Sequence, residues 1–499
     1  MPLVRSHLAV IALTALALAG AIGCSPSHRP GLPPGSPFAE AEAPATSLFS
    51  HGVAIGDLSS RSVVLWVRTD GPAKITVEYG PMTSESEPGP REFHATHHRS
   101  DARETDAVRD YTLTIALADL RPATAYGFRI TAVPLSTQPV AHPGPAVRAE
   151  EVTGRFTTLA DPPAHGPIRF GWSADLGGQA RCRDTAAGYP IFDVARLFPM
   201  EFFLLLGDTI YADEICSAPS NAPGSEFTAT TLETYRAKHR YQRGSPALQR
   251  FLATVPVFVV WDDHEVRNNF SGPFEAKMPV GRQALFDYWP IRQDPADPHR
   301  LYRRIQAGAT LDVFILDTRQ YRSRNGDADG PGKTMLGETQ LIWLLDGLAQ
   351  STATWKVIAS SVPLSVSKEG PLHTPGNDGW ANGADGTGFE TELTRIADWI
   401  ASRHIRNVVW LAADVHFVQA NVYDVDGDGR ADFHEFVAGP LSAASGRMVP
   451  PRSPFRIRTL VHEGGYWNFG RVMADEKNFE VTIIDEAGRQ RFFHRVVAQ

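Results

Sequence analysis

The sequence has no excess of positive charge. Its 48 lysine and arginine residues are outnumbered by 56 acidic residues, which leaves a formal net charge of −8. Such a chain has no broad electrostatic attraction for nucleic acids or anionic membranes, so long nucleic acid is not an expected partner. The rest of the composition, with 42% hydrophobic and 21% charged residues, is ordinary for a globular protein. A length of 499 residues predicts two domains.

Long hydrophobic runs are missing beyond the N-terminus. Residues 8–22 form an apolar stretch behind Arg5 and His7; it is too short for a transmembrane helix and has the pattern of a secretory signal. The stretch ends in Ala21-Ile22-Gly23-Cys24, which is similar to a bacterial lipobox. We therefore expect residues 1–24 to be a lipoprotein signal peptide, with lipidation of Cys24. The protein is then exported and lipid-anchored to the bacterial cell envelope, in the periplasm or at the cell surface. The alternative is a plain signal peptide with an incidental cysteine.

Cysteine is scarce, with two residues left after Cys24. Cys182 and Cys216 both lie in loops that follow predicted strands. Because export places them in an oxidising compartment, we expect them to form a disulfide. Two buried free thiols, or one thiol that ligates a metal, are the alternatives.

The character of the chain changes twice after the signal. Residues 25–46 are rich in Pro, Ser, Gly and Ala, which predicts a flexible tether. Residues 47–160 contain short runs of β formers separated by turn residues, which predicts a β-sandwich. The segment 120–130, with Tyr126 beside a turn, resembles the corner of a fibronectin type III sandwich. In residues 165–499 apolar runs alternate with helical patterns, which predicts an α/β domain.

Acidic and histidine residues follow four buried runs of this second region, at the point where each run ends. The pairs of run and residue are 168–173 with Asp175, 202–206 with Asp208, 255–260 with Asp263 and His264, and 408–413 with Asp414 and His416. Strand-to-loop junctions are where open α/β sheets place their chemistry, so we expect these side chains to meet. Carboxylates and imidazoles that converge there predict a pair of metal ions.

A metal pair suits the hydrolysis of a phosphate ester, because two cations neutralise phosphoryl oxygens and lower the pKa of a bound water. Asp208, which follows Gly207, is the predicted bridge between them. Asp175, Tyr211 and His416 are expected to complete the first site, where a phenolate favours a ferric ion. Asp263 and Asp414 are expected to complete the second, whose oxygen ligands suit Ca²⁺, Mg²⁺ or Mn²⁺.

Further residues near this centre have predicted roles in catalysis. His264 lies beside the second metal and is the predicted general acid for the leaving oxygen, so that His264 and Asp208 are the catalytic candidates. Arg267, Asn268 and Asn269 follow closely and are the predicted phosphate contacts.

Several sequence blocks make the chain similar to the alkaline phosphatase D family of the metallophosphoesterase superfamily. The blocks are GDTIYA at 207–212, VPVFVVWDDHEVRNN at 255–269, LDTRQYR at 316–322 and ADVH at 413–416. The resemblance covers the chain from about residue 47 to its end. It implies a four-layer α/β/β/α metallophosphoesterase sandwich preceded by a fibronectin-III-like β-sandwich domain. It also implies phosphomonoesterase, phosphodiesterase or phospholipase-D-like activity with iron and calcium, while Mn²⁺, Mg²⁺ and Zn²⁺ are alternatives.

The chain departs from that family in two places. Family members often have a cysteine ligand after the first catalytic strand, where this chain has Asp175, so the identity of the first metal stays open. Cys182 is an alternative ligand with poor spacing. Some relatives end in a helix that covers the site, whereas residues 479–484 and 490–497 read as strands here. An uncovered site would admit bulkier diesters.

Two more acidic patterns have structural interpretations. Residues 317–322 follow a buried strand and are expected to support the site, with substrate contact by Arg319 or Arg322 as the alternative. A second pattern matches the twelve-position calcium loop and predicts a structural Ca²⁺. Its acids are Asp424, Asp426, Asp428, Asp432 and Glu435. Because its flanks read as strands, an acidic hairpin tip without an ion is the alternative.

These features together favour a lipid-anchored phosphoesterase in which a hydroxide on the first metal attacks phosphorus in line. The substrate is a phosphodiester, a phospholipid headgroup or a monoester. A non-catalytic binding lipoprotein on the same scaffold and a metal-dependent nuclease for short oligonucleotides are the alternatives.

Overall fold

The computed structural model describes residues 47–82, 98–135, 149–366, 379–382 and 386–499. The predicted signal peptide, the tether and Cys24 lie outside the described residues. Residues 43–499 form one compact unit. Within the described parts of the chain, no helix is both long and apolar enough to cross a membrane.

Two large sheets form the centre of this unit. The nine-stranded sheet has the order β21 (Gln490–Val497), β20 (Asn478–Asp485), β19 (Asn468–Ala474), β9 (Ile168–Ser173), β10 (Phe202–Leu206), β11 (Val257–Val260), β1 (Val53–Gly56), β2 (Val63–Arg68) and β6 (Thr112–Leu117). The seven-stranded sheet has the order β12 (Arg303–Ala307), β13 (Leu311–Ile315), β14 (Trp355–Ala359), β15 (Val408–Ala412), β17 (Phe433–Val437), β16 (Val418–Asp424) and β18 (Arg456–Glu463).

The central strands are parallel and buried on both faces, which explains their continuous apolar sequences. β10, for example, reads FFLLL and is buried throughout. Its Phe202 stacks on Phe170 of β9 with ring centroids 4.9 Å apart. Trp355 of β14 contacts Phe479 of β20 at 5.2 Å, so the aromatic core joins one sheet to the other.

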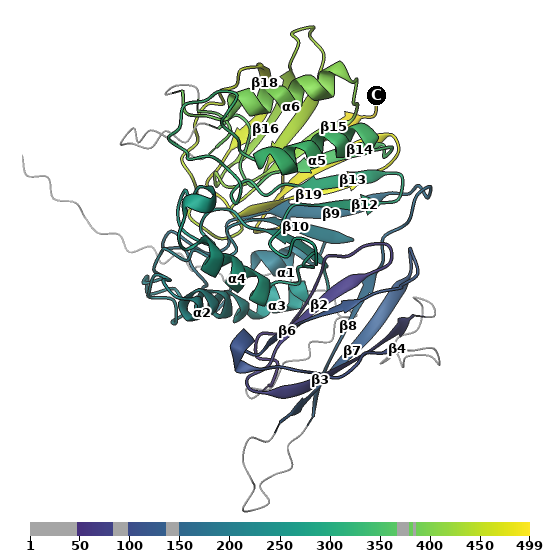
Figure 1. Cartoon of the computed structure of the whole chain (residues 1–499), viewed down its shortest axis with the longest axis vertical. Helices are drawn as coiled ribbons and strands as arrows, with labels where there is room; N and C mark the ends of the chain where they lie inside the picture. Colours follow the sequence, from purple (N-terminus) through teal and green to yellow (C-terminus); the bar gives the residue numbers. More distant parts are fainter. Residues whose placement is uncertain (1–46, 83–97, 136–148, 367–378, 383–385) are drawn as a thin grey trace, which may run out of the picture. The chain divides into compact units, whose positions relative to one another are not determined.

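Helices cover the outer faces of the two sheets (Figure 1). They are α1 (Ile191–Ala195), α2 (Leu232–Arg243), α3 (Pro246–Leu252), α4 (Met278–Tyr288), α5 (Gly337–Gln350) and α6 (Glu390–Ser402), with short 3-10 turns at Ala107–Arg109 and Gly272–Phe274. α5 and α6 pack on the seven-stranded sheet through Leu344, Ile396 and Trp410. On the nine-stranded sheet, Phe251 of α3 packs edge-on against Phe203 at 5.4 Å. The layers are therefore α/β/β/α, which confirms the predicted fold class.

The N-terminal β region contains two sheets. One is β1-β2-β6, and the other is β4 (His98–Arg99), β3 (Ala73–Pro81), β7 (Ala125–Pro134) and β8 (Glu150–Thr157), with β5 (Arg103–Glu104) beside β3. Their apolar side chains, such as Leu65 and Phe128, belong to one core. The Tyr126 hydroxyl accepts a hydrogen bond of 2.8 Å from the Arg121 amide, which is the arrangement of a tyrosine corner.

This N-terminal region is continuous with the nine-stranded sheet. β1 pairs in parallel with β11, Gly56 opposite Val257, so β1, β2 and β6 extend the nine-stranded sheet. The boundary at residues 160–165 stays a prediction, and the structure adds that a sheet crosses it. At the other end of the chain, β20 and β21 form where strands are expected.

Candidate metal centre

The predicted ligands lie in loops that leave the carboxyl ends of β9, β10, β11 and β15. Their backbones are left-handed at four positions: φ is 65° at Asp175, 50° at Asp208, 72° at Asp414 and 58° at His416. Such conformations cost on the order of 1–3 kcal/mol each for residues with a side chain and cluster at functional sites. Gly207 allows the tight approach, because a Cβ there would lie 2.3 Å from Cβ of Asp262.

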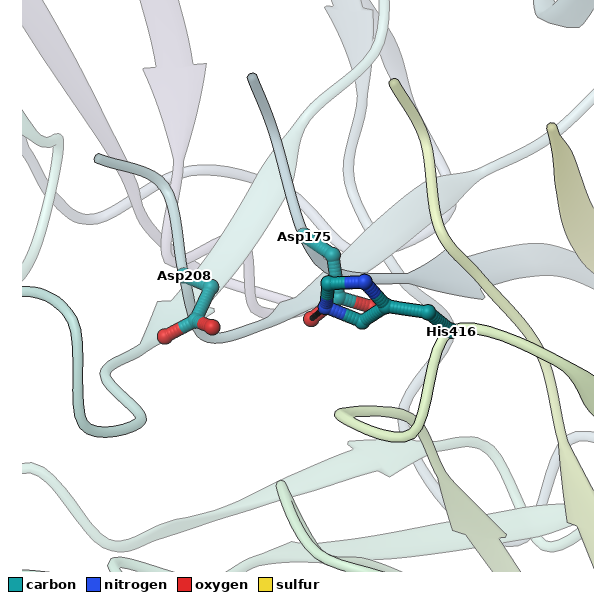
Figure 2. A group of neighbouring side chains, drawn as sticks. All are labelled: Asp175, Asp208 and His416. Carbon is teal, nitrogen blue, oxygen red and sulfur yellow. Dashed lines mark ion pairs between the residues drawn. The ribbon is translucent and has the colours of Figure 1, made fainter. Parts of the chain in front are cut away.

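The first cluster contains Asp175, Asp208 and His416, whose ligand atoms lie within 4.8 Å of one another. Figure 2 shows these three side chains, which come from three separate segments of the chain. His416 Nε2 is 3.4 Å from Asp175 Oδ1. All three residues are buried, so the cluster has the ligand types and the enclosure that a metal site needs.

His416 is held in an orientation that suits a metal ligand. Its Nδ1–H donates to the carbonyl of Ala444 at 2.5 Å, which turns Nε2 towards Asp175. The Tyr211 hydroxyl donates to that Nε2 at 3.0 Å. Tyr211 thus lies at the first cluster, as its predicted role requires. Burial and the carboxylates of Asp208 and Asp175 raise the pKa of Tyr211 well above its usual value, and a bound cation would oppose that effect.

A second cluster shares Asp208 with the first. Its ligand atoms come from Asp208, Asp263 and His264, again within 4.8 Å. Asp263 also groups with Asp262 and Asp414. Asp208 thus belongs to two adjoining groups of candidate ligand atoms.

The electrostatics of these residues fit cations as occupants. Asp175 is 0% exposed, and neither of its carboxylate oxygens accepts a hydrogen bond from any described residue. Burial, together with Asp263 and Asp262, raises the pKa of Asp208 well above its usual value. Several carboxylates buried this close together are unfavourable unless positive charge joins them. The donor set of oxygen and imidazole atoms suits Fe³⁺, Ca²⁺, Mn²⁺, Mg²⁺ or Zn²⁺.

The predicted general acid has a partner that the sequence motifs do not indicate. His264 Nδ1 lies 2.7 Å from Asp213 Oδ1, and its ring stacks on Tyr211 with centroids 4.2 Å apart. Burial favours the neutral imidazole, but the carboxylates of Asp263 and Asp213 raise the pKa of His264 from 6.5 to about 9. The signal available in the sequence was the position of Asp213, a carboxylate only two residues after the predicted ligand Tyr211.

Glu265 is a second residue whose role the sequence does not indicate. Its buried carboxylate accepts hydrogen bonds from the amides of Asp208 (3.1 Å), Thr209 (2.7 Å) and Asp262 (2.9 Å). It therefore joins the loops that follow β10 and β11. A further hydrogen bond joins the same two loops: the backbone amide of His264 donates to Asp208 Oδ1 at 3.1 Å.

The three predicted phosphate contacts differ in their surroundings. Arg267 and Asn268 are exposed, and the Arg267 guanidinium pairs with Glu275. The Asn268 amide donates to Asp213 Oδ2 at 2.7 Å, and the Asn269 amide to Asp263 Oδ2 at 2.6 Å. Backbone contacts thus place this loop beside His264, while the substrate-binding roles stay predictions.

Cys182 and Cys216 form a disulfide, with Cα atoms 5.8 Å apart. The bond joins the loop after β9 to the loop after β10. Gly178 packs against the Tyr211 ring, and a Cβ there would lie 2.1 Å from its Cγ. Because its sulfur is in the disulfide, Cys182 is not available as an alternative metal ligand.

The acidic hairpin at 424–435 requires one correction. Asp424, Asp426 and Asp432 lie close enough together to hold an ion, and Gly429 has φ 88°. Glu435, the predicted twelfth-position ligand, instead points into the core from β17. Its carboxylate accepts from the Leu364 amide at 2.6 Å and the Tyr423 hydroxyl at 2.5 Å. Because side chains alternate between the two faces of a strand, Glu435 points into the core and away from the loop. Calcium binding by Asp424, Asp426, Asp428 and Asp432 stays a prediction.

Comparison with known proteins decides the family. A family model described as PhoD-like phosphatase matches residues 178–462, which is more than half of the chain. The chain belongs to the PhoD-like phosphatase family. A second model, the N-terminal domain of PhoD-like phosphatases, matches residues 35–159. The resemblance inferred from the motifs is therefore confirmed.

Individual relatives agree with this assignment. Alkaline phosphatase D of Bacillus subtilis (strain 168) is 28% identical over 415 residues, which cover 76% of this chain and 66% of that relative, just under two thirds of its length. A solved structure of PhoD matches with a TM-score of 0.70 at 21% identity, covering 92% of this chain and 94% of the other. Purple acid phosphatase PPD1 from yellow lupin (Lupinus luteus) seeds matches with a TM-score of 0.58 at 12% identity, covering 89% and 73%. These two structures show a shared fold.

Membership of the PhoD-like phosphatase family makes phosphoester hydrolysis the activity to propose for this chain. The buried clusters around Asp208 can hold the metal ions.

Proposed function

We propose that the chain hydrolyses phosphodiesters or phosphomonoesters, phospholipid headgroups among them, at two cations bridged by Asp208. The observation that carries this proposal is the shared position of Asp208 in two buried groups of ligand atoms. Asp175, Tyr211 and His416 would hold one cation, and Asp263 and Asp414 the other. Ferric iron suits the first set because Tyr211 offers a phenol, and calcium suits the oxygen ligands of the second.

The cations would neutralise phosphoryl oxygens and lower the pKa of a water molecule for attack. The residues of the chain do the rest. Asp208 would supply ligand atoms to both sites, and the hydrogen bond from His416 to Ala444 keeps the other ring nitrogen, Nε2, turned towards the site. His264 is held by Asp213 with its Nδ1–H engaged, so its Nε2 is the atom that would give a proton to the leaving oxygen.

Hydrolysis of bis(p-nitrophenyl) phosphate against p-nitrophenyl phosphate tests the proposal, with protein lacking residues 1–24. Diester preference that Asp208→Asn abolishes would support a phosphodiesterase, and monoester preference would support a phosphatase. Asp346→Asn, on the exposed side of α5, is a matched control that should keep full activity. Bound metal without hydrolysis of either ester would refute the proposal and favour a binding lipoprotein, whereas cleavage restricted to short oligonucleotides would indicate a nuclease.

We also propose that the protein is exported and held at the cell envelope by a lipid on Cys24. The lipobox-like sequence 21–24 supports this. Labelled palmitate should enter the parent protein and not Cys24→Ser, and the variant should leave the membrane fraction. Labelling of the variant, or an unlabelled parent, would contradict the anchor.

A further inference from the structure

The predicted ligands come from two different sheets. Asp175, Asp208 and Asp263 follow strands of the nine-stranded sheet, whereas Asp414 and His416 follow β15 of the seven-stranded sheet. The sheets meet through an apolar core, and apolar packing is not directional. Metal ligands, in contrast, must keep their separation to a few tenths of an ångström. Polar contacts between loops of the two sheets are therefore needed to hold the ligands at a fixed separation.

One buried ion pair makes such a contact. Arg319, in the loop after β13, directs its guanidinium onto Asp262, with Nε 2.7 Å from Oδ1 and Nη2 2.9 Å from Oδ2. Ser361, in the loop after β14, donates to the same Oδ1 at 2.6 Å. The side chains of Arg319 and Asp262 are 0% and 1% exposed. Asp262, in the loop that follows β11 of the nine-stranded sheet, is thus held by two loops of the seven-stranded sheet.

The position of the charge matters as well as the geometry. Arg319 Nη2 lies 3.8 Å from Oδ2 of Asp263, the neighbour of Asp262. Oxygens of Asp262, Asp263 and Asp414 lie within 4.8 Å of one another. With its carboxylate engaged by a bidentate guanidinium, Asp262 neither competes with Asp263 for a cation nor leaves its own charge uncompensated.

We propose that Arg319 is a positioning residue of the metal centre. By holding Asp262 it sets the distance between Asp263 on one sheet and Asp414 on the other. It contacts no substrate in this role. The proposal rests on the proposed function for its activity measurement, but metal affinity tests it independently of any reaction.

Arg319→Lys is the decisive variant, because it keeps the charge and loses the planar fork. We expect metal-stripped full-length protein with this change to bind Mn²⁺ about 10- to 100-fold more weakly in calorimetric titration, as for other residues that orient ligands. Saturating Mn²⁺ should restore most of kcat. Arg322→Lys is the matched control: Arg322 lies buried in the same loop, and its guanidinium contacts Thr318 and Asn325. It should lose thermal stability and keep the parent affinity.

Equal Mn²⁺ affinities for the two lysine variants would overturn the proposal. If Arg319→Lys does not fold, Arg319→Gln combined with Asp262→Asn replaces the ion pair by neutral hydrogen-bonding groups. Weakened Mn²⁺ binding by this folded double variant supports the proposal, and parent affinity overturns it. If the parent binds Mn²⁺ but hydrolyses no phosphate ester, the proposed function fails while the affinities still decide the role of Arg319.

Discussion

At the scale of single residues, the candidate metal centre combines ligands that follow apolar runs with supporting residues whose partners lie far away along the chain. Asp208, Asp263 and His416 stand directly after apolar runs, so their place at strand ends could be inferred from sequence order. Asp213 contacts His264, which lies 51 residues away along the chain, and Arg319 contacts Asp262, which lies 57 residues away. Nothing in their local sequence specifies such partners, because contacts of this kind depend on how the loops pack.

The pair of His264 and Asp213 leads to a prediction about leaving groups. Asp213→Asn should lower kcat for phenyl phosphate about 10- to 100-fold, because a poor leaving group needs a proton from a well-oriented His264. The rate with p-nitrophenyl phosphate should change little, since nitrophenolate leaves without protonation. Steady-state kinetics with both esters would check this. His264→Asn should show the same selectivity, and an equal fall with both esters would contradict the assigned role.

At the scale of secondary structure, helical periodicity and continuous apolar runs predicted the positions of several elements. The sequence predicts a helix over 231–242, and α2 covers Leu232–Arg243 with Thr231 as its N-cap. The buried strands β9, β10, β13, β14 and β15 lie where apolar runs place them. The hydrophobic pattern does not show which strands pair with each other. β1 pairs with β11 although their residues lie about 200 positions apart, and the sequence of such short strands does not specify that pairing.

Helix α2 contains a histidine that should make stability depend on pH. His239 is 2% exposed and stacks on Tyr288 at 5.2 Å. Burial and the nearby Arg243 lower the pKa of His239 from 6.5 to about 3. The unfolded chain therefore binds this proton more readily, so stability is complete above about pH 6.5 and declines as the pH falls towards 3.

Replacing this residue isolates its contribution. His239→Phe should lose less free energy of unfolding between pH 7 and pH 5 than the parent, by up to about 2 kcal/mol. Urea unfolding at both pH values measures the difference. His98→Gln, on the exposed strand β4, is the control and should behave like the parent. The same pH dependence in His239→Phe and in the parent would argue against a neutral His239 in the folded state.

The disulfide should stabilise the loops that flank the metal centre. It closes a segment with a sequence separation of 34, which contains Asp208 and Tyr211. Cys182→Ser combined with Cys216→Ser should lower the free energy of unfolding by about 2–4 kcal/mol, because the unfolded chain regains conformational freedom. Urea unfolding with and without a reductant checks this. Reductant should bring the parent to the value of the variant and leave the variant unchanged; no effect on the parent would contradict the prediction.

At the scale of the whole molecule, the shared sheet predicts that residues 165–499 do not fold alone. Without residues 47–160, β11 would lose its neighbour β1 and become an exposed edge. Arg243 would also lose Trp66: its Cζ lies 4.2 Å from the ring centroid of Trp66 and 4.4 Å from that of Trp289. We expect the fragment 165–499 to be insoluble or to unfold without cooperativity.

Gel filtration and thermal unfolding followed by circular dichroism would test that expectation. A fragment that begins at residue 47 is the control and should remain monodisperse with a cooperative transition. Cooperative unfolding of the fragment 165–499 would mean that β1, β2 and β6 are an appendage rather than part of the fold.

The spacing of the ligands along the chain has a consequence for how the protein acquires its metal. The first cluster combines Asp175 with His416, 241 residues further along the chain, and the carbonyl that orients His416 belongs to Ala444. A nascent or translocating polypeptide therefore has no complete binding site until almost all of it has emerged. For a chain that crosses a membrane unfolded, the cation would be captured on the far side. The ion concentrations of that compartment, and not those of the cytosol, would then decide which metal the mature protein carries.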